Sequence, residues 1–325
     1  MSLISRDLAR VLGSTAIALV LTGTIAKAEP AVTMDGAAYR YSAGGTDTTS
    51  GNTFEAATSG PTKRAWGMLV YNGSIANVSD TTVITSGSQA HGIQVGAKGG
   101  NADGTDHSTI NLGNGVNVTT SGNDSYGLHA IDGGIISGTA TIGTTGARAY
   151  GAFAESFSTI DLTGGSITTS GSLAYGLLAN NDMNTVGGKI TATDVDIDTS
   201  SSWTFGAYAK NGGEITLNGG SITTTGERAY GILASNGGIV SSSADIKTTF
   251  DKTHGIQAGE DANNPGGRVN LTGGSVTTDG VFSVGLHAVQ GGTIQGNTTI
   301  TTNGVNGHGA FAESDSIIAL NNSTC

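Results

Sequence analysis

The chain has 325 residues, of which 54 are glycine, 3 are proline and 12% are charged, and its formal net charge at pH 7 is −11. An acidic chain repels phosphate groups, so we do not expect nucleic acid to be a partner. The single cysteine, Cys325, excludes an internal disulfide framework.

The N-terminus has the pattern of a secretory signal peptide. Arg6 and Arg10 precede an apolar run from Val11 to Ile25, and the small residues of Ala26–Ala28 suit a cleavage site directly after them. The apolar run is too short for a transmembrane anchor. We therefore expect residues 1–28 to be a signal peptide and the mature chain to be exported.

From residue 66 onward the chain repeats a short pattern, in which an aromatic residue or a histidine precedes a glycine and an apolar residue follows it. Val284 is the one exception at the first position. Successive glycines lie 24 or 25 residues apart in the basic unit (for example 92 − 67 = 25), and 30 or 35 residues apart where the unit is longer. The ten glycines are Gly67, Gly92, Gly127, Gly151, Gly176, Gly206, Gly231, Gly255, Gly285 and Gly309.

Each unit contains three short runs that are typical of β-strands. In one unit they are Gly206–Ala209, Glu214–Leu217 and Ser221–Thr225, and turn sequences rich in glycine and asparagine separate them. Three strands and three turns form one rung of a solenoid. We therefore predict an all-β, right-handed, single-stranded parallel β-helix of about ten rungs. Residues 66–325 would supply the rungs, and residues 29–65 an N-terminal cap or an imperfect first rung.

The repeat places equivalent residues in columns, which predict where side chains point. One residue after the glycine the chain is always apolar, and three residues after it the chain always has valine or alanine. Because side chains of a strand alternate between two faces, we expect these two columns to point inward and the mixed column between them to point outward. The direction of the aromatic column before the glycine stays open, since a bend at the glycine would break the alternation. We favour a stacked ladder near a corner.

Three longer units carry insertions, which are the candidate binding loops. They span about Gly96–Ser108, Asn180–Gly188 and Gly259–Gly267, and all three leave the turn that follows the Val/Ala column. They occur in every third rung, so the loops would repeat at about 14 Å along one edge. Loops on rigid scaffolds often carry binding function, although a solenoid also tolerates neutral insertions. The candidate binding residues are Asn101, Asp103, Asp106, Asn181, Asp182, Glu260, Asp261 and Asn263.

The acidic, glycine-rich stretch GGNADGTDH contains two weak calcium candidates, Asp103 and Asp106. The stretch lacks the spacing and the tandem copies of calcium-binding nonapeptide repeats, so a solvated loop is the simpler interpretation. We expect no metal site and no cofactor.

Histidines do not make a metal site more plausible. Five of the six histidines fall in repeat columns, which indicates packing within a ladder and not the convergence that a zinc site needs. They are His91, His254 and His308 before the glycine, and His129 and His287 two residues after it.

Catalysis has little support in the sequence. A glycan-cleaving site would need two carboxylates close together. One outward column of alternate rungs, made of Asn111, Asp161, Thr216 and Asn270, holds a single acid. No GxSxG nucleophile elbow is present. We therefore predict that the chain is not an enzyme.

The signal peptide and rungs such as GGSITTTGERAYGILASNGG and GGSITTSGSLAYGLLA resemble the passenger domain of Gram-negative autotransporters, in its pertactin-like form. The resemblance covers the chain from about Ala65 to the end. It implies a surface stalk in a family of mostly adhesins and virulence factors, with some proteases and esterases. It also implies a C-terminal translocator barrel in the full-length protein. No barrel follows the repeats here, and the pattern stops within a rung, so we expect a fragment or a truncated chain. Such a chain would lie at the cell surface or outer membrane if full-length, and would be periplasmic or secreted as given.

The function predicted from the sequence is a non-catalytic surface adhesin or stalk, which binds a host cell-surface or matrix ligand. Two alternatives remain open. One is a secreted β-helical enzyme that acts on polysaccharides. The other is a self-associating protein that binds like chains on neighbouring bacteria and aggregates them.

Overall fold

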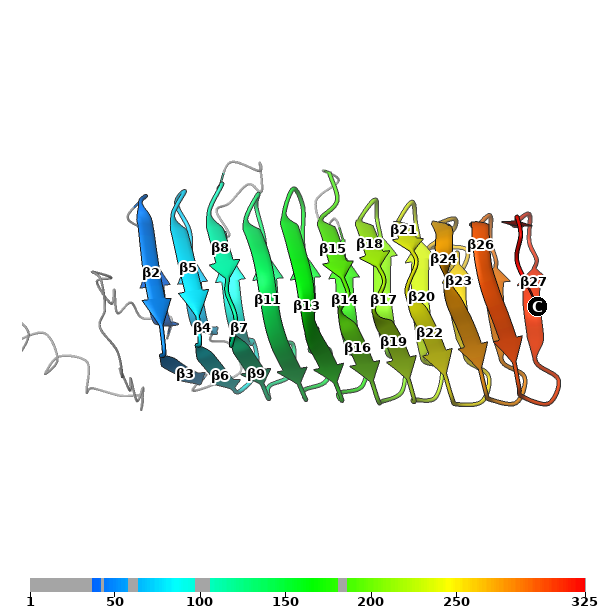
Figure 1. Ribbon diagram of the computed structural model, residues 1–325, viewed down its shortest axis with the longest axis horizontal. Coiled ribbons are helices and arrows are strands. Elements are labelled where there is room, and N and C mark those ends of the chain that lie inside the picture. The colour runs from blue at the N-terminus through cyan, green and yellow to red at the C-terminus, as the bar shows by residue number, and fades with distance from the viewer. Residues whose placement is uncertain (1–36, 42–43, 58–63, 97–105, 181–185, 325) are drawn as a thin grey trace, which may run out of the picture.

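The computed structural model describes residues 37–41, 44–57, 64–96, 106–180 and 186–324. Within these ranges every regular element is a β-strand, and the described residues form a solenoid of stacked parallel strands with about ten turns (Figure 1). The predicted fold class is therefore confirmed. The described part of the chain has no helix of the length and hydropathy that crossing a membrane requires. The predicted signal peptide, residues 1–28, lies outside the described residues.

Each rung contributes strands to three faces, which we number in the order that the chain visits them. Turn 1 joins the first face to the second, turn 2 joins the second to the third, and turn 3 leads into the next rung. The first face stacks, in this order, β1 (Ala37–Tyr41), β4 (Ala65–Val70), β7 (Ala90–Val95), β10 (Leu128–Ala130), β12 (Ala152–Ala154), β14 (Tyr175–Ala179), β17 (Phe205–Lys210), β20 (Tyr230–Ser235), β23 (His254–Ala258), β25 (Val284–Ala288) and β27 (His308–Ala312).

The other two faces merge wherever one long strand bends across both of them. The second face contains β2 (Thr46–Ser50), β5 (Ile75–Ser79), β8 (Thr109–Leu112), β15 (Lys189–Thr193), β18 (Glu214–Asn218), β21 (Ile239–Ser242) and β28 (Ile317–Leu320). The third face contains β3 (Thr53–Ala57), β6 (Thr82–Ser86), β9 (Asn117–Thr120), β16 (Asp196–Thr199), β19 (Ser221–Thr224) and β22 (Asp245–Thr248). The strands that bend across both faces are β11 (Ile135–Thr144), β13 (Thr159–Thr169), β24 (Arg268–Thr278) and β26 (Thr293–Thr302).

Strands β1 to β3 come from the stretch before the sequence repeats. They pair in parallel with β4, β5 and β6, so the described residues between Ala37 and Ala57 stack on the solenoid as a further rung. Tyr39 and Phe54 of these strands are buried and belong to the main core. Residues 29–36 lie outside the described part of the chain.

The core is a continuous column of small and branched apolar side chains inside the solenoid. The residues one and three positions after the repeat glycine, such as Leu128 and Ala130, are completely buried in every rung before the last. They meet isoleucines from the other faces, among them Ile142 and Ile160. Apolar burial of this kind is the main stabilising term in a protein core. The two predicted inward columns are thus confirmed.

The repeat glycine is the place where the strand bends. A Cβ added to Gly127 would point into the core, against Ile142, and would lie 2.6 Å from the carbonyl oxygen of Gly151 in the next rung. Leu128, the next residue, also points into the core and is fully buried. Two consecutive residues therefore face inward, and the regular alternation breaks between them. Only glycine fits the first of these two positions.

Because of this bend, the aromatic column lies on the outer side of the first face. Successive rings stack as a ladder: centroids are 5.0 Å apart between Tyr126 and Tyr150, and 4.9 Å apart between Tyr150 and Tyr175. The predicted ladder is confirmed, and its open direction is now settled as outward.

The mixed column lies on the same outer side, as predicted, but most of its side chains before the last rung are buried. Phe153, Leu178, Tyr208 and Leu233 are buried in a second apolar cluster, against rings of the ladder. Edge-to-face contacts join the two columns, as between Tyr150 and Phe153 at 5.6 Å. The first face therefore has apolar layers on both sides.

Candidate functional site

The three insertions emerge from one edge of the solenoid, at turn 1. They follow β7, β14 and β23, which lie three strands apart on the first face. The described ends of these loops therefore recur in every third rung along one edge, as the repeat spacing predicts. Four of the candidate binding residues, Asn101, Asp103, Asn181 and Asp182, lie outside the described residues.

Asp106 holds the end of the first insertion against the neighbouring rung. Its carboxylate accepts hydrogen bonds from the backbone N–H groups of Asn72 and Gly73 at 3.2 and 3.3 Å. It also accepts hydrogen bonds from the backbone N–H and the hydroxyl of Ser108. A carboxylate with this many N–H and O–H donors is occupied structurally, as in a cap. Asp103 lies outside the described residues, so the interpretation of this stretch as a solvated loop without calcium stays a prediction.

The third insertion is described throughout, and its acidic residues point in two directions. Glu260 turns back onto the first face, where its Oε2 accepts a hydrogen bond of 2.7 Å from the hydroxyl of Tyr208. Asp261 stays in the loop, and its Oδ1 accepts hydrogen bonds from the backbone N–H groups of Asn263 and Asn264 at 2.8 and 2.9 Å. Glu260 therefore anchors the loop, and Asp261 shapes its tip. The side chain of Asn263 is exposed beside that tip.

The outer column of the second face carries amide and hydroxyl groups and one isolated acid. Asp161 pairs in register with Ser137 on one side and Thr191 on the other, so this acid has no carboxylate neighbour in its column. Amides bond to their neighbours along the column, as where Asn111 donates to Asn77 over 2.8 Å. The arrangement lacks the paired carboxylates that glycoside hydrolysis uses.

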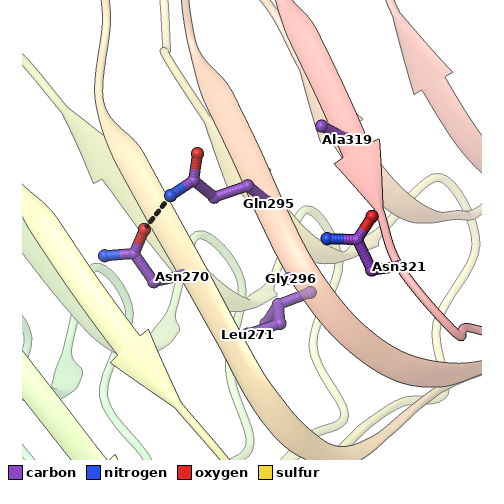
Figure 2. A pocket seen from close by; sticks show the side chains of 6 residues that line it. All are labelled: Asn270, Leu271, Gln295, Gly296, Ala319 and Asn321. Carbon is purple, nitrogen blue, oxygen red and sulfur yellow. Dashed lines mark hydrogen bonds between the residues drawn. The ribbon is translucent and has the colours of Figure 1, made fainter.

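Toward the C-terminal end, this column borders a hollow of about 420 Å³ (Figure 2). Three amides, Asn270, Gln295 and Asn321, stand around it, above small or apolar residues. The Gln295 side chain donates a 3.0 Å hydrogen bond to Oδ1 of Asn270. The lining is uncharged, so the hollow has hydrogen-bonding capacity but no group suited to proton transfer.

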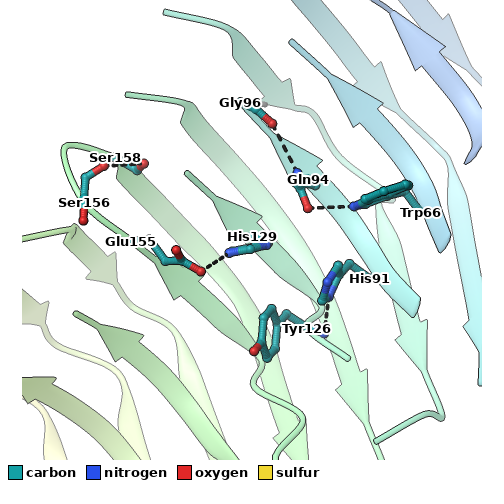
Figure 3. A network of polar contacts seen from close by, with 9 residues as sticks. All are labelled: Trp66, His91, Gln94, Gly96, Tyr126, His129, Glu155, Ser156 and Ser158. Carbon is teal, nitrogen blue, oxygen red and sulfur yellow. Dashed lines mark hydrogen bonds and ion pairs between the residues drawn. The ribbon is translucent and has the colours of Figure 1, made fainter. Parts of the chain in front are cut away.

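Buried polar groups lie on the outer side of the first face (Figure 3). At its N-terminal end, Nε1 of Trp66 donates a 2.6 Å hydrogen bond to Gln94, whose amide nitrogen donates to the carbonyl oxygen of Gly96. In the following rungs, Nε2 of His129 lies 2.8 Å from Oε1 of Glu155. These polar tips thus have partners, whereas Nδ1 of His129, His254 and His287 is buried without a hydrogen bond.

The His–Glu pair occurs twice. Nε2 of His287 lies 3.1 Å from Oε1 of Glu313, and each of the two pairs is separated by 26 residues (155 − 129 and 313 − 287). In each case the histidine of the pair packs against a histidine of the ladder, with centroids 5.2 Å apart for His91 and His129 and 4.6 Å apart for the other two. The second histidine of the latter contact is His254.

Two ladder histidines, His91 and His254, are kept neutral by their surroundings. Burial, and then the neighbouring His129, hold the pKa of His91 well below its usual value. Burial, followed by His287, lowers the pKa of His254 to about 3. The described residues contain no group of three or more His, Cys, Asp or Glu side chains that could hold a metal ion. The histidines act here as aromatic rings with a polar edge.

These pairs were missed in the sequence, although a signal was present. The glutamate follows the glycine of its rung by four residues in both cases, and the histidine follows the preceding glycine by two. Once rungs are in register, these offsets place the two side chains side by side.

No protein-family model and no curated protein matches the chain. Among solved structures, it is similar to a chain of the cryo-EM structure of the Vag8–C1 inhibitor complex. The two are 18% identical with a TM-score of 0.59, and the match covers 89% of this chain and 73% of the other. At this identity, the likeness shows a shared fold.

Proposed function

We propose that this chain is an exported passenger segment of the autotransporter type, which acts as a non-catalytic adhesin or stalk at the cell surface. The observation that carries the proposal is the edge at turn 1, where three insertions leave a rigid solenoid at intervals of three strands. A stacked solenoid fixes the distances between such loops, and loops on a rigid scaffold are suited to binding.

Two further findings support this proposal. A chain of the same fold occurs in the complex of Vag8 with C1 inhibitor, so the fold is compatible with a protein–protein complex. In addition, the third insertion is ordered by internal hydrogen bonds from Asp261 and by the contact of Glu260 with Tyr208. An ordered loop loses less conformational entropy on binding than a flexible loop does.

The test replaces each insertion by the short turn of a rung that has none, such as Ser235–Gly238. Beads coated with the chain are measured for attachment to cultured epithelial cells, laminin, fibronectin and collagen. We expect attachment to fall as loops are removed, while the thermal unfolding midpoint stays within a few degrees. Alanine at two exposed residues near turn 2, Asn114 within the turn and Asn218 at the end of β18, is the matched control and should leave attachment unchanged.

Undiminished attachment of the variant without all three loops would contradict the role of this edge. The non-catalytic part of the proposal has its own test. The chain is incubated with neutral and acidic polysaccharides, and newly formed reducing ends are assayed. Their appearance would favour the alternative of a polysaccharide-active enzyme.

A further inference from the structure

The opposite edge of the solenoid, at turn 3, carries a row of exposed apolar side chains. The tips of turn 3 line the lower edge in Figure 1, one below each rung. Leu173, Trp203 and Phe282 occupy equivalent tip positions, and 40%, 45% and 53% of their surfaces are exposed. We call the tips from Leu173 to Phe282 the turn-3 ridge. It spans four rung steps, or about 19 Å.

The backbone at these tips does not favour such residues. Residues at this position have positive φ, with values of 57°, 57° and 56° at Leu173, Trp203 and Phe282. This left-handed conformation suits glycine and asparagine and is strained for bulky side chains. Asn306 occupies the same position in a later rung. Large apolar residues at these tips therefore have neither a favourable backbone conformation nor full burial within the chain. Contact with another molecule would account for their presence.

Between the apolar tips, the ridge carries adjacent acids and bases. Glu227 and Arg228 form one such pair, and Asp251 and Lys252 form the next. The guanidinium of Arg228 lies over the ring of Trp203, 4.6 Å from its centroid. Its contact with Glu227 is loose, at 3.9 Å, and both side chains are more than half exposed. The charges of Glu227 and Arg228 are thus available to a second molecule.

This order of residues is self-complementary. If two ridges face each other across a two-fold axis parallel to the solenoid, each rung meets its own copy with the chain direction reversed. Glu227 of one chain then faces Arg228 of the other, Asp251 faces Lys252, and each apolar tip lies beside its own copy across the axis. A two-fold interface requires this kind of self-complementarity. Tryptophan and arginine are also the residue types that dominate binding energy at protein interfaces.

We propose that the turn-3 ridge is a dimerisation surface, through which two copies of this chain associate side by side. The surface lies on the edge opposite the insertions, so both surfaces can be used at once. The dimer does not depend on the ligand proposed for turn 1, and its failure would leave that proposal untouched.

Sedimentation equilibrium of the purified chain measures the association directly. We expect a monomer–dimer equilibrium that weakens about 30-fold or more in Trp203→Asn and in Phe282→Asn, as removal of a central interface residue does. Asparagine suits positive φ, so neither substitution should impair folding, which circular dichroism checks. The matched control is Phe157→Asn. Phe157 has a φ of 63° and is 37% exposed, but it lies at turn 1. This control should dimerise like the unaltered chain.

A charge exchange tests the orientation. Arg228→Glu alone should weaken the dimer, and the double variant Glu227→Arg/Arg228→Glu should restore it, because the two charges again face opposite charges. A monomeric chain at all concentrations would overturn the proposal, as would equal weakening by Phe157→Asn. If the chain instead binds phosphatidylcholine vesicles with a Trp203-dependent shift in fluorescence and remains monomeric in solution, the ridge is a lipid-binding edge and the proposal is wrong.

Discussion

Replacing a repeat glycine by alanine should destabilise the solenoid, although the change adds only one methyl group. In Gly127→Ala the new Cβ would meet Ile142 and the carbonyl oxygen of Gly151, the latter at 2.6 Å. Ordinary van der Waals contact begins near 3.4 Å, so the strand of the next rung has to move. That carbonyl oxygen already accepts a hydrogen bond of 2.9 Å from the backbone N–H of Leu128. Its movement therefore strains the ladder between rungs.

The expected loss in the free energy of unfolding of Gly127→Ala is the sum of three contributions. Overpacking a tight core costs about 1–3 kcal/mol, and the upper end applies because the obstructing atom is backbone. Weakening the hydrogen bond adds about 1 kcal/mol. The reduced freedom of the unfolded chain offsets about 0.4–1 kcal/mol. We therefore expect the free energy of unfolding to fall by about 3 kcal/mol.

Gly143→Ala is the matched control, because a Cβ at Gly143 has no heavy atom within 4 Å. It should leave stability unchanged or raise it by up to about 1 kcal/mol. Urea unfolding followed by far-ultraviolet circular dichroism gives the midpoints. Because a solenoid can unfold in parts, hydrogen exchange at the N–H of Leu128 supplies a local measure. Equal losses in the two variants, or an unchanged midpoint in Gly127→Ala, would refute the argument that the glycine column is required by close approach.

Three further outcomes follow from the outer layer of the first face. Tyr150→Ala should lower the free energy of unfolding by about 2–3 kcal/mol, because it removes a ring that stacks on both of its neighbours, at 5.0 and 4.9 Å. Phe157 is exposed, so Phe157→Ala should change the free energy of unfolding little, and thermal melts compare the two variants. Tyr208→Phe should lower the free energy of unfolding by about 1–2 kcal/mol, because it loses the hydrogen bond to Glu260. A double-mutant cycle with Glu260→Gln should show coupling between the two changes, and additive effects would contradict the contact. The pKa of His254 is lowered to about 3 in the folded chain, so the unfolded chain binds the proton more readily. The stability that neutral His254 contributes is therefore complete above about pH 6.5 and falls as the pH drops toward 3. The fall in urea midpoint between pH 6.5 and 4 should be smaller in His254→Gln than in the unaltered chain.

Much of this fold can be predicted because each rung repeats the same physical problem. A column such as Leu128 and its equivalents is apolar in every rung, and stacking is the arrangement that buries all of them at once. The positions of the three insertions follow in the same way from counting residues between glycines. Local sequence and period are sufficient for such features, since the strands of each rung pair only with those of the neighbouring rungs.

The outer layer could not be predicted in the same way. Its existence depends on the bend at the repeat glycine, which turns the aromatic column outward and places Tyr150 beside Phe153. The sequence shows that a glycine is needed but not which way the chain bends. The role of Glu260 was also hidden, because a carboxylate in an insertion suggests a solvated loop until Tyr208 is seen beneath it.

Because the first face is buried on both sides, its role differs from that of the second and third faces. A parallel sheet with apolar layers on both sides resembles the interior of a larger protein, and its ladder of rings adds stacking to the hydrogen bonds between rungs. The second and third faces keep a solvated outer side with amides, hydroxyls and isolated acids such as Asp161. Stiffness therefore comes from the first face, several of whose buried polar atoms are already paired internally, as in the contact of His129 with Glu155. Partners can bind at the two edges that border this face, turn 1 and turn 3, without disturbing it, and both proposed contact surfaces lie there. A ligand that competes with neither edge but protects the ladder tyrosines from iodination would show that this division is wrong.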